Sequence, residues 1–140
     1  MAVQIFFIET SVTLKERRRL KQFIKEVFLR KKRILVNLNL IFCTDEYLLN
    51  INNSFLQHDY YTDIVTFNLS DNPLVIDGEV YISIDRVKEN AIANGVTILN
   101  ELHRIIFHGV LHLCGFKDKS RKDKLLMTQK EDRTLKQYLR

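Results

Sequence analysis

The sequence predicts a single α+β domain over residues 1–140, with a small mixed four-stranded sheet covered by about five helices. Four short segments have the apolar runs or the alternating pattern of β-strands. Five longer segments combine helix-start residues with apolar side chains at helical spacing. Strands and helices mix without a repeat or a linker, so we expect the helices to cover one sheet. With 46% hydrophobic residues, a chain of this length can bury one core.

The first half of the chain predicts two strands and two helices in alternation. Residues 3–8 form a short apolar run typical of a strand. Residues 13–32 predict a helix capped by its first residue, a threonine, with one apolar and one basic face. Residues 34–43 alternate between two sets of side chains and predict a second strand. A short helix then starts at Thr44 or Asp45 and runs to about residue 55.

The second half predicts two further strands and then helices to the end. Residues 63–69 and 74–84 predict strands, separated by a turn at Asp71-Asn72-Pro73. Asp85 can cap the helix that follows, and Gly95 can end it. Three helices are predicted, at residues 85–94, 97–114 and 121–139.

The basic residues are concentrated at the two ends of the chain. Residues 1–36 carry ten basic and three acidic side chains, and residues 116–140 carry nine basic and four acidic ones. Residues 37–115 carry three basic and ten acidic side chains. Dense basic segments attract phosphate backbones, although such residues also form ordinary solvated helix faces. The candidate contacts to a nucleic acid in the first segment are Arg17, Arg18, Arg19, Lys31, Lys32 and Arg33.

The two cysteines and the lengths of the apolar segments predict the cellular compartment of the protein. Cys43 and Cys114 both lie in apolar runs, so we expect buried thiols in a reducing environment and no disulfide. The first residues lack the features of a signal peptide. No apolar run approaches the ~18 residues of a membrane span. We expect a soluble cytoplasmic protein without a membrane partner.

The segment from His108 to Asp118 predicts a metal site at the end of a central, buried helix. His108 and His112 are four residues apart, so one helix face presents both imidazoles. Gly115 can end the helix and reverse the chain, which would return Asp118 as a third ligand. Three protein ligands and one open position are typical of catalytic zinc sites. We expect one Zn²⁺, with other divalent metals as possible occupants.

Other residues near this segment leave alternatives open. Asp123 would replace Asp118 if the turn were longer. Glu101 shares the helix stripe of the histidines and could orient one of them, or it could only complement the helix dipole. His103 points away from the pair, and Cys114 lies on the wrong face to join the site. The spacing is similar to that of metzincin proteases, but Gly109 stands where they have a glutamate base, which argues against peptide hydrolysis.

With these residues in view, the chain resembles the YbeY family of bacterial endoribonucleases and ribosomal RNA maturation factors. Residues 108–118, HGVLHLCGFKD, are similar to the family signature H-G-x-L-H-L-x-G-Y-D-H. Residues 62–67, TDIVTF, are similar to its T-D-V-L-S-F, and residues 78–83, GEVYIS, to its G-D-I-x-I-S. Met127 and Glu131 fit its C-terminal helix.

The resemblance implies a zinc-dependent endoribonuclease that cleaves single-stranded RNA in ribosomal RNA processing and small-subunit maturation. Its implied partners are ribosomal RNA and the small ribosomal subunit with its proteins. Two positions depart from the family: Asp118 replaces the usual third histidine, and Leu56 stands where the family places an arginine thought important for activity. Arg86 or Lys117 could supply the missing cation and contact RNA.

Two other classes of function remain open. The first is a non-catalytic ribosome assembly factor that binds RNA and is stabilised by its metal. The second is a metal-dependent hydrolase of peptides or small molecules. No residue can be named from the sequence as the general acid or base.

Overall fold

A computed structural model describes residues 2–56 and 62–140, except for the side chain of residue 56. The strands are β1 (Val3–Phe7), β2 (Ile34–Cys43), β3 (Ile64–Asn68) and β4 (Val75–Ser83). They form one sheet in the order β1-β2-β4-β3. β1, β2 and β4 run parallel, and β3 pairs antiparallel with β4 at the edge. The predicted small, mixed, four-stranded sheet is therefore confirmed.

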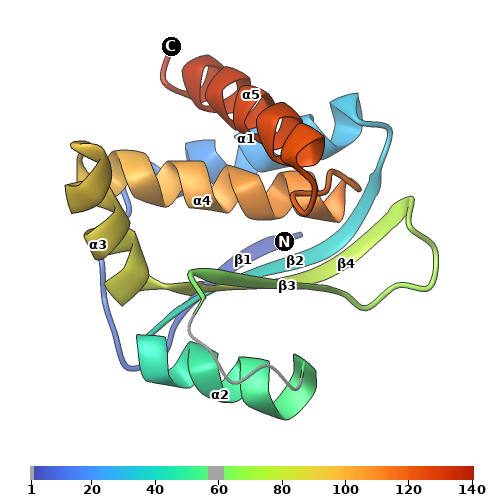
Figure 1. Cartoon of the computed structure of the whole chain (residues 1–140). Coiled ribbons are helices and arrows are strands. Elements are labelled where there is room, and N and C mark those ends of the chain that lie inside the picture. The colour runs from blue at the N-terminus through green and yellow to red at the C-terminus, as the bar shows by residue number, and fades with distance from the viewer. Residues whose placement is uncertain (1, 57–61) are drawn as a thin grey trace.

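Five helices in the described residues cover this sheet: α1 (Arg17–Arg30), α2 (Asp45–Leu56), α3 (Ile84–Asn94), α4 (Ile98–Leu113) and α5 (Arg121–Tyr138). Figure 1 shows α4 lying across one face of the sheet, with α5 on its outer side and α2 on the opposite face. α1 contacts β1, β2 and α4. The α+β class predicted from the sequence is confirmed.

α4 is the central helix because it packs on the sheet below and on α5 above. Its apolar side chains are buried nearly all round, including Leu102, Ile106, Phe107 and Val110. Thr97, the first residue of the predicted helical segment, caps it by accepting a hydrogen bond from the Asn100 backbone N–H at 3.0 Å. The same helix carries both histidines of the predicted metal site.

Gly109 explains how α4 lies so close to the sheet. A Cβ atom at this position would lie 3.0 Å from Ile64 Cδ1 on β3 and 3.0 Å from Val80 Cγ1 on β4. A side chain there would push the helix away from the strands. The glutamate of the metzincin motif is therefore excluded at this position by packing.

The predicted start of the first helix is wrong. α1 begins at Arg17, and Glu16 precedes it with a left-handed backbone, φ 52° and ψ 48°, and no side-chain cap. Thr13 does not cap α1, because the chain between them places Leu14 in the core, where it is 6% exposed. Burial of that leucine outweighs the local capping preference of the threonine.

The predicted cap of α3 is also wrong, for a reason that lies far away in the sequence. Ser83 Oγ accepts the Arg86 backbone N–H at 3.2 Å and caps α3. The Asp85 carboxylate instead accepts the Asp45 backbone N–H at 2.8 Å, at the start of α2. Thr44 Oγ1 accepts the Tyr47 N–H at 3.2 Å and completes the start of α2, as predicted.

Both cysteines are buried and free, as expected from their apolar surroundings. Burial raises the pKa of the Cys43 thiol to about 12 and that of Cys114 to about 11. None of the helices within the described residues combines the length and the hydrophobicity that a membrane span requires.

Candidate metal centre

The last turns of α4 and the turn after it assemble the candidate metal ligands. The rings of His108 and His112 lie one helical turn apart, with centroids 4.5 Å from each other. Gly115 has φ 99°, and its N–H donates to the His112 carbonyl oxygen at 2.9 Å. The Phe116 N–H donates to the Leu111 carbonyl oxygen at 3.1 Å. These bonds end the helix and reverse the chain, which brings Asp118 back toward the histidines.

The three donor atoms face a common point. Asp118 Oδ2 lies 3.4 Å from His108 Nε2 and 3.2 Å from His112 Nε2. One ligand atom from each of the three residues lies within 4.8 Å of the others. Ligands about 2.0–2.1 Å from a tetrahedral zinc ion lie roughly 3.3 Å apart. The donor set and its spacing therefore fit a divalent transition metal, and the identity of that metal stays a prediction.

Asp123, the alternative third ligand, lies elsewhere. It is in the first turn of α5, and its N–H donates to Ser120 Oγ at 3.0 Å in the cap of that helix. The turn after Gly115 is short, so it returns Asp118 and not Asp123 to the histidines.

Glu131 on α5 holds the other nitrogen of His108. Glu131 Oε2 lies 2.5 Å from His108 Nδ1, and the glutamate is 9% exposed. Burial acts to lower the pKa of His108, but the hydrogen bond and the charge of Glu131, joined by Asp118, raise it overall. Arg104 Nη1 binds Glu131 Oε1 at 3.3 Å, and Arg104 Nη2 binds Asp132 Oδ1 at 2.7 Å. A carboxylate in this position fixes the tautomer of the ring and leaves Nε2 free for a metal.

The orienting role considered for Glu101 is thus occupied by a different residue. The Glu101 carboxylate accepts a hydrogen bond from Asn94 Nδ2 at 3.3 Å, two helical turns before His108. From the sequence, Glu131 is a match to the last helix of the YbeY family and has no predicted role at the metal site. A local signal was nevertheless present, because Glu131 lies midway between Met127 and Leu135 in an otherwise apolar stripe of α5.

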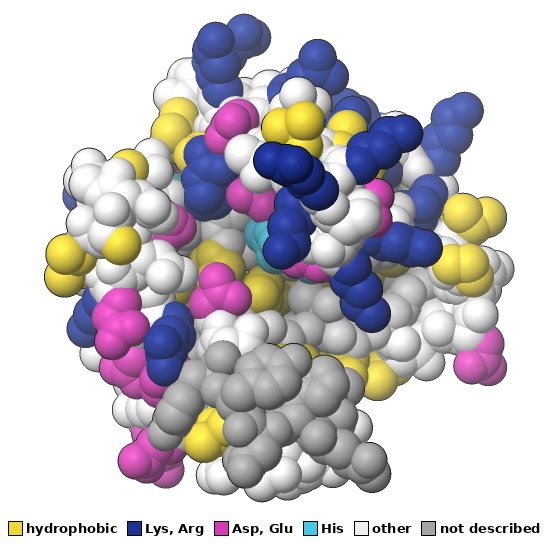
Figure 2. Space-filling view, viewed as in Figure 1, with side chains coloured by type: hydrophobic (Ala, Val, Ile, Leu, Met, Phe, Trp, Pro, Cys, Tyr) yellow, Lys and Arg dark blue, Asp and Glu magenta, His cyan; other side chains and the backbone are white. Residues whose placement is uncertain are grey.

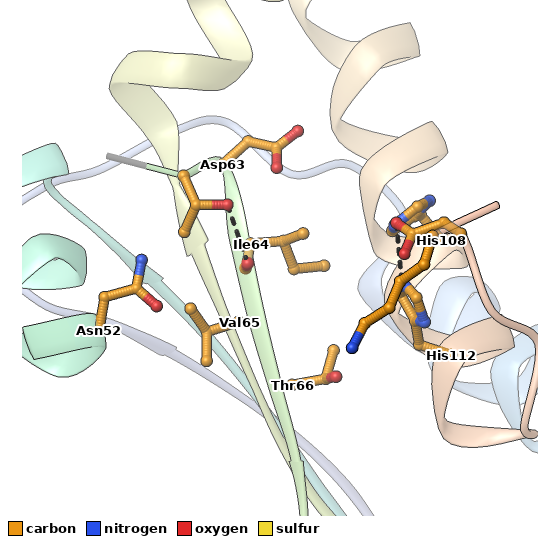
Figure 3. A pocket seen from close by; sticks show the side chains of 10 residues that line it. Asn52, Asp63, Ile64, Val65, Thr66, His108 and His112 are labelled. Carbon is orange, nitrogen blue, oxygen red and sulfur yellow. Dashed lines mark hydrogen bonds and ion pairs between the residues drawn. The ribbon is translucent and has the colours of Figure 1, made fainter. Parts of the chain in front are cut away.

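A pocket of about 370 Å³ opens in front of the histidines. Figure 3 shows His108 and His112 on one side of it and the segment from Asp63 to Thr66 on the other. Burial raises the pKa of Asp63, against the opposing effects of His108 and a backbone hydrogen bond. Lys119 also lines the pocket. The pocket thus brings a carboxylic acid and an ammonium group to the candidate metal ligands.

The structure divides the predicted RNA contacts into exposed and engaged groups. Five of the predicted contacts are exposed, and Lys31 is partly buried; the exposed residues are Arg17, Arg18, Arg19, Lys32 and Lys117. Arg33 is engaged within the fold, since its guanidinium donates hydrogen bonds to the carbonyl oxygens of Cys114 at 2.6 Å and Lys31 at 2.8 Å. Arg19 contacts the Tyr138 carbonyl oxygen and Glu16. Arg86 binds Asp45 at 3.1 Å.

His103 and Leu56 both lie outside the cluster of candidate metal ligands. His103 is buried 4.9 Å from the Tyr138 ring, and its two ring nitrogens have no hydrogen-bond partner among the described residues. Its role is structural packing. Leu56 is the last residue of α2, and its side chain lies outside the described part of the chain.

Known proteins resemble this chain over nearly its whole length. The profile of the family described as "Endoribonuclease YbeY" matches residues 6–139. The chain belongs to the YbeY endoribonuclease family. The YbeY resemblance inferred from the sequence motifs is confirmed.

Curated YbeY relatives and one solved structure agree with this assignment. Endoribonuclease YbeY of Cytophaga hutchinsonii is 47% identical over 133 residues, covering 94% of this chain and 93% of the relative. Endoribonuclease YbeY of Porphyromonas gingivalis is 45% identical over 119 residues, covering 85% of this chain and 78% of the relative. The solution structure of TM1509 from Thermotoga maritima matches with a TM-score of 0.63 and 25% identity, covering 97% of this chain and 88% of that one.

Proposed function

We propose that this YbeY family member is a zinc-dependent endoribonuclease that cleaves single-stranded RNA. In this proposal, the protein acts in the cytoplasm, in ribosomal RNA processing and small-subunit maturation. Its partners are ribosomal RNA and the small ribosomal subunit. The observation that carries the proposal is the meeting of His108 Nε2, His112 Nε2 and Asp118 Oδ2 at the wall of an open pocket. The YbeY family membership supplies the substrate class.

The residues around the cluster have separate tasks in this proposal. His108, His112 and Asp118 would hold the ion, which supplies a Lewis acid for the phosphodiester. Glu131 accepts a hydrogen bond from His108 Nδ1–H and keeps that ring oriented. Asp63 is the pocket carboxyl group best placed to hold or release a proton, because burial favours its protonated form. Lys119 would attract the phosphate.

The surface around the pocket fits a polyanionic substrate. Figure 2 shows Lys and Arg side chains gathered around a visible histidine, over the part of the molecule occupied by α5 and the loop before it. Acidic side chains are more frequent on the opposite side of the cleft in this view. An RNA strand would therefore meet the basic rim first.

A cleavage assay tests the proposal. Purified protein is stripped with a chelator and incubated with labelled single-stranded RNA, with and without added zinc. We expect cleavage only with zinc, its loss in Asp118→Ala, and about a 100-fold slower turnover in Asp63→Asn. Cleavage of double-stranded RNA at an equal rate, or activity without any divalent metal, would contradict the proposal.

A second candidate function is a non-catalytic assembly factor. It is favoured by Leu56, which stands at the position of the family's arginine. RNA binding with no cleavage under any metal would support this alternative. Cleavage of a peptide substrate would instead support a metal-dependent hydrolase of peptides.

A further inference from the structure

A second cavity, separate from the pocket, lies between the end of α1 and the second half of α5. Its volume is about 140 Å³. Four basic side chains line it together with Thr134 and Gln137: Arg30, Lys31, Lys130 and Arg133. We call this cavity the α1–α5 groove.

The positive charge of the α1–α5 groove is not neutralised within the described residues. None of the four basic side chains has a carboxylate oxygen within 4.0 Å there, whereas Arg104 and Arg86 each bind two carboxylates. Among the described residues, Arg30 makes two long polar contacts, at 3.4 Å to the Glu26 carbonyl oxygen and at 3.5 Å to Gln137 Oε1. An anion would relieve the repulsion between these side chains.

The titration of Lys31 agrees with a groove that lacks negative charge. Burial and then the neighbouring Lys130 lower the pKa of Lys31; Cys114 opposes this shift, and Arg133 and Arg30 add to it. Stabilisation of helix C-termini accounts for Arg30 and Lys31, which end α1. It does not account for Lys130 and Arg133, which lie within α5 and far from its end.

Phe116 connects the groove to the metal centre. The ammonium groups of Lys31 and Lys130 lie 5.4 Å and 5.6 Å from the centre of the Phe116 ring. Phe116 precedes Asp118 by two residues, in the loop over residues 115–119. Lys117 and Lys119 flank Asp118 in the same loop, and Lys119 lines the pocket. Basic side chains therefore follow one another from the pocket, along this loop, to the groove.

We propose that the α1–α5 groove binds a phosphodiester group of the RNA strand outside the cleavage pocket, so that the strand crosses the 115–119 loop. This rests on the proposed ribonuclease function for the identity of the polyanion. Phosphate contacts of this kind fix the register of a strand without reading its sequence. A charged groove beside an aromatic ring is also typical of single-strand binding.

The test compares two double variants that remove equal charge. The groove variant is Lys130→Gln with Arg133→Gln, and the matched control is Lys15→Gln with Lys88→Gln, two exposed positions that do not line the groove. Zinc-free protein is titrated with a fluorescent single-stranded decanucleotide at several salt concentrations, and anisotropy gives the affinity. Zinc affinity and far-ultraviolet circular dichroism verify that both variants keep their fold and metal centre.

We expect the groove variant to bind RNA less tightly and to lose two phosphate contacts. The slope of log K against log salt concentration should then become shallower by about 1.4, at about 0.7 for each contact with a single strand. The control variant should keep the slope of the unchanged protein. With zinc present, the groove variant should show a higher KM and an unchanged kcat.

Equal slopes for the groove and control variants would overturn the proposal. So would a groove variant that keeps its RNA affinity but no longer binds a polyglutamate peptide, since the groove would then serve an acidic protein partner. If the two variants have equal slopes and the protein still cleaves RNA, the ribonuclease function is supported and RNA binding by the groove is refuted. If the slopes differ but the protein does not cleave RNA, RNA binding by the groove is supported and the ribonuclease function is refuted.

Discussion

At the metal centre, the side chain of Glu131 connects α5 to α4 through two contacts, one to His108 and one to Arg104. It lies 2.5 Å from His108 Nδ1 and is itself held by Arg104 on α4. Carboxylates in this position orient a metal-binding imidazole and increase its basicity. The contact between α5 and α4 is therefore part of the centre, although α5 supplies none of the three candidate ligands.

Replacing this carboxylate should weaken metal binding. We expect Glu131→Gln to reduce zinc affinity by about 10- to 100-fold, because the amide no longer fixes the ring as a charged acceptor does. Competition with a chromophoric chelator measures the affinity. Asp132→Asn is the matched control, since Asp132 also binds Arg104 but is exposed, and no bond joins it to His108 within the described residues. Equal affinities in the two variants would refute the role of Glu131.

His103 should make the stability of the fold depend on pH. Burial, and to a smaller extent Arg19, lower its pKa in the folded protein. As the pH falls below about 6.5, the unfolded chain binds a proton at this residue before the folded one does. The stability linked to neutral His103 is therefore complete above that pH and is lost as the pH falls toward the folded pKa.

We expect His103→Phe to lose less stability than the unchanged protein between about pH 7.5 and pH 5.5. The phenyl ring can keep the packing on Phe107 and Tyr138 without a titrating group. Urea denaturation at the two pH values measures this difference. Other groups, including His108 with its raised pKa, contribute equally to both proteins and cancel. An identical pH dependence in both proteins would rule out this role for His103.

The position of α4 depends on a close approach between helix and sheet. Gly109 faces Ile64 and Val80, and Gly78 on β4 faces Leu113 of the same helix, where an added Cβ would lie 3.0 Å from Leu113 Cδ1. Two positions without side chains thus let the helix lie low on the strands. This places His108 and His112 beside β3, whose first residues form the other wall of the pocket.

A glutamate at position 109 should not be tolerated. We expect Gly109→Glu to destabilise the fold by about 4 kcal/mol or more, because a charged side chain would be forced against buried strands. Gln129→Glu, at an exposed position of α5, should change stability by no more than about 0.5 kcal/mol. Denaturation curves and soluble yield measure both variants. A stable Gly109→Glu protein would show that α4 can move off the sheet.

For the molecule as a whole, a metal ion at the candidate centre would add bonds between the end of α4 and the loop that leads to α5. Two of the centre's residues come from α4 and the third from the loop that leads to α5. A ligand that binds only the folded state stabilises it by mass action. Metal binding should therefore strengthen the whole fold as well as the pocket.

Zinc at about 100 times its dissociation constant should raise the free energy of unfolding by about 2.7 kcal/mol, and a chelator should reverse this. Thermal denaturation with and without zinc measures the change. Asp118→Ala should abolish the rise in Tm, whereas Asp123→Ala should keep it. A rise that survives in Asp118→Ala would place the ion elsewhere.

Much of the fold and the centre of the site followed from local sequence patterns. Helix and strand periodicity gave the order of the elements, and the spacing of His108 and His112 placed both on one face of α4. Gly115 predicted the reversal that returns Asp118. These features depend on the geometry of a few consecutive residues, which is why a pattern in the chain is enough to predict them.

Contacts between distant segments needed the folded chain. Packing of α5 on α4 put Glu131 beside His108, and packing of α4 on β3 put Asp63 in the pocket. A contact of the same kind pairs the Asp85 carboxylate with the Asp45 backbone N–H at the start of α2, so Asp85 does not cap its own helix. Spacing along a chain does not state which surfaces meet, because that choice depends on the burial of apolar side chains from all elements together.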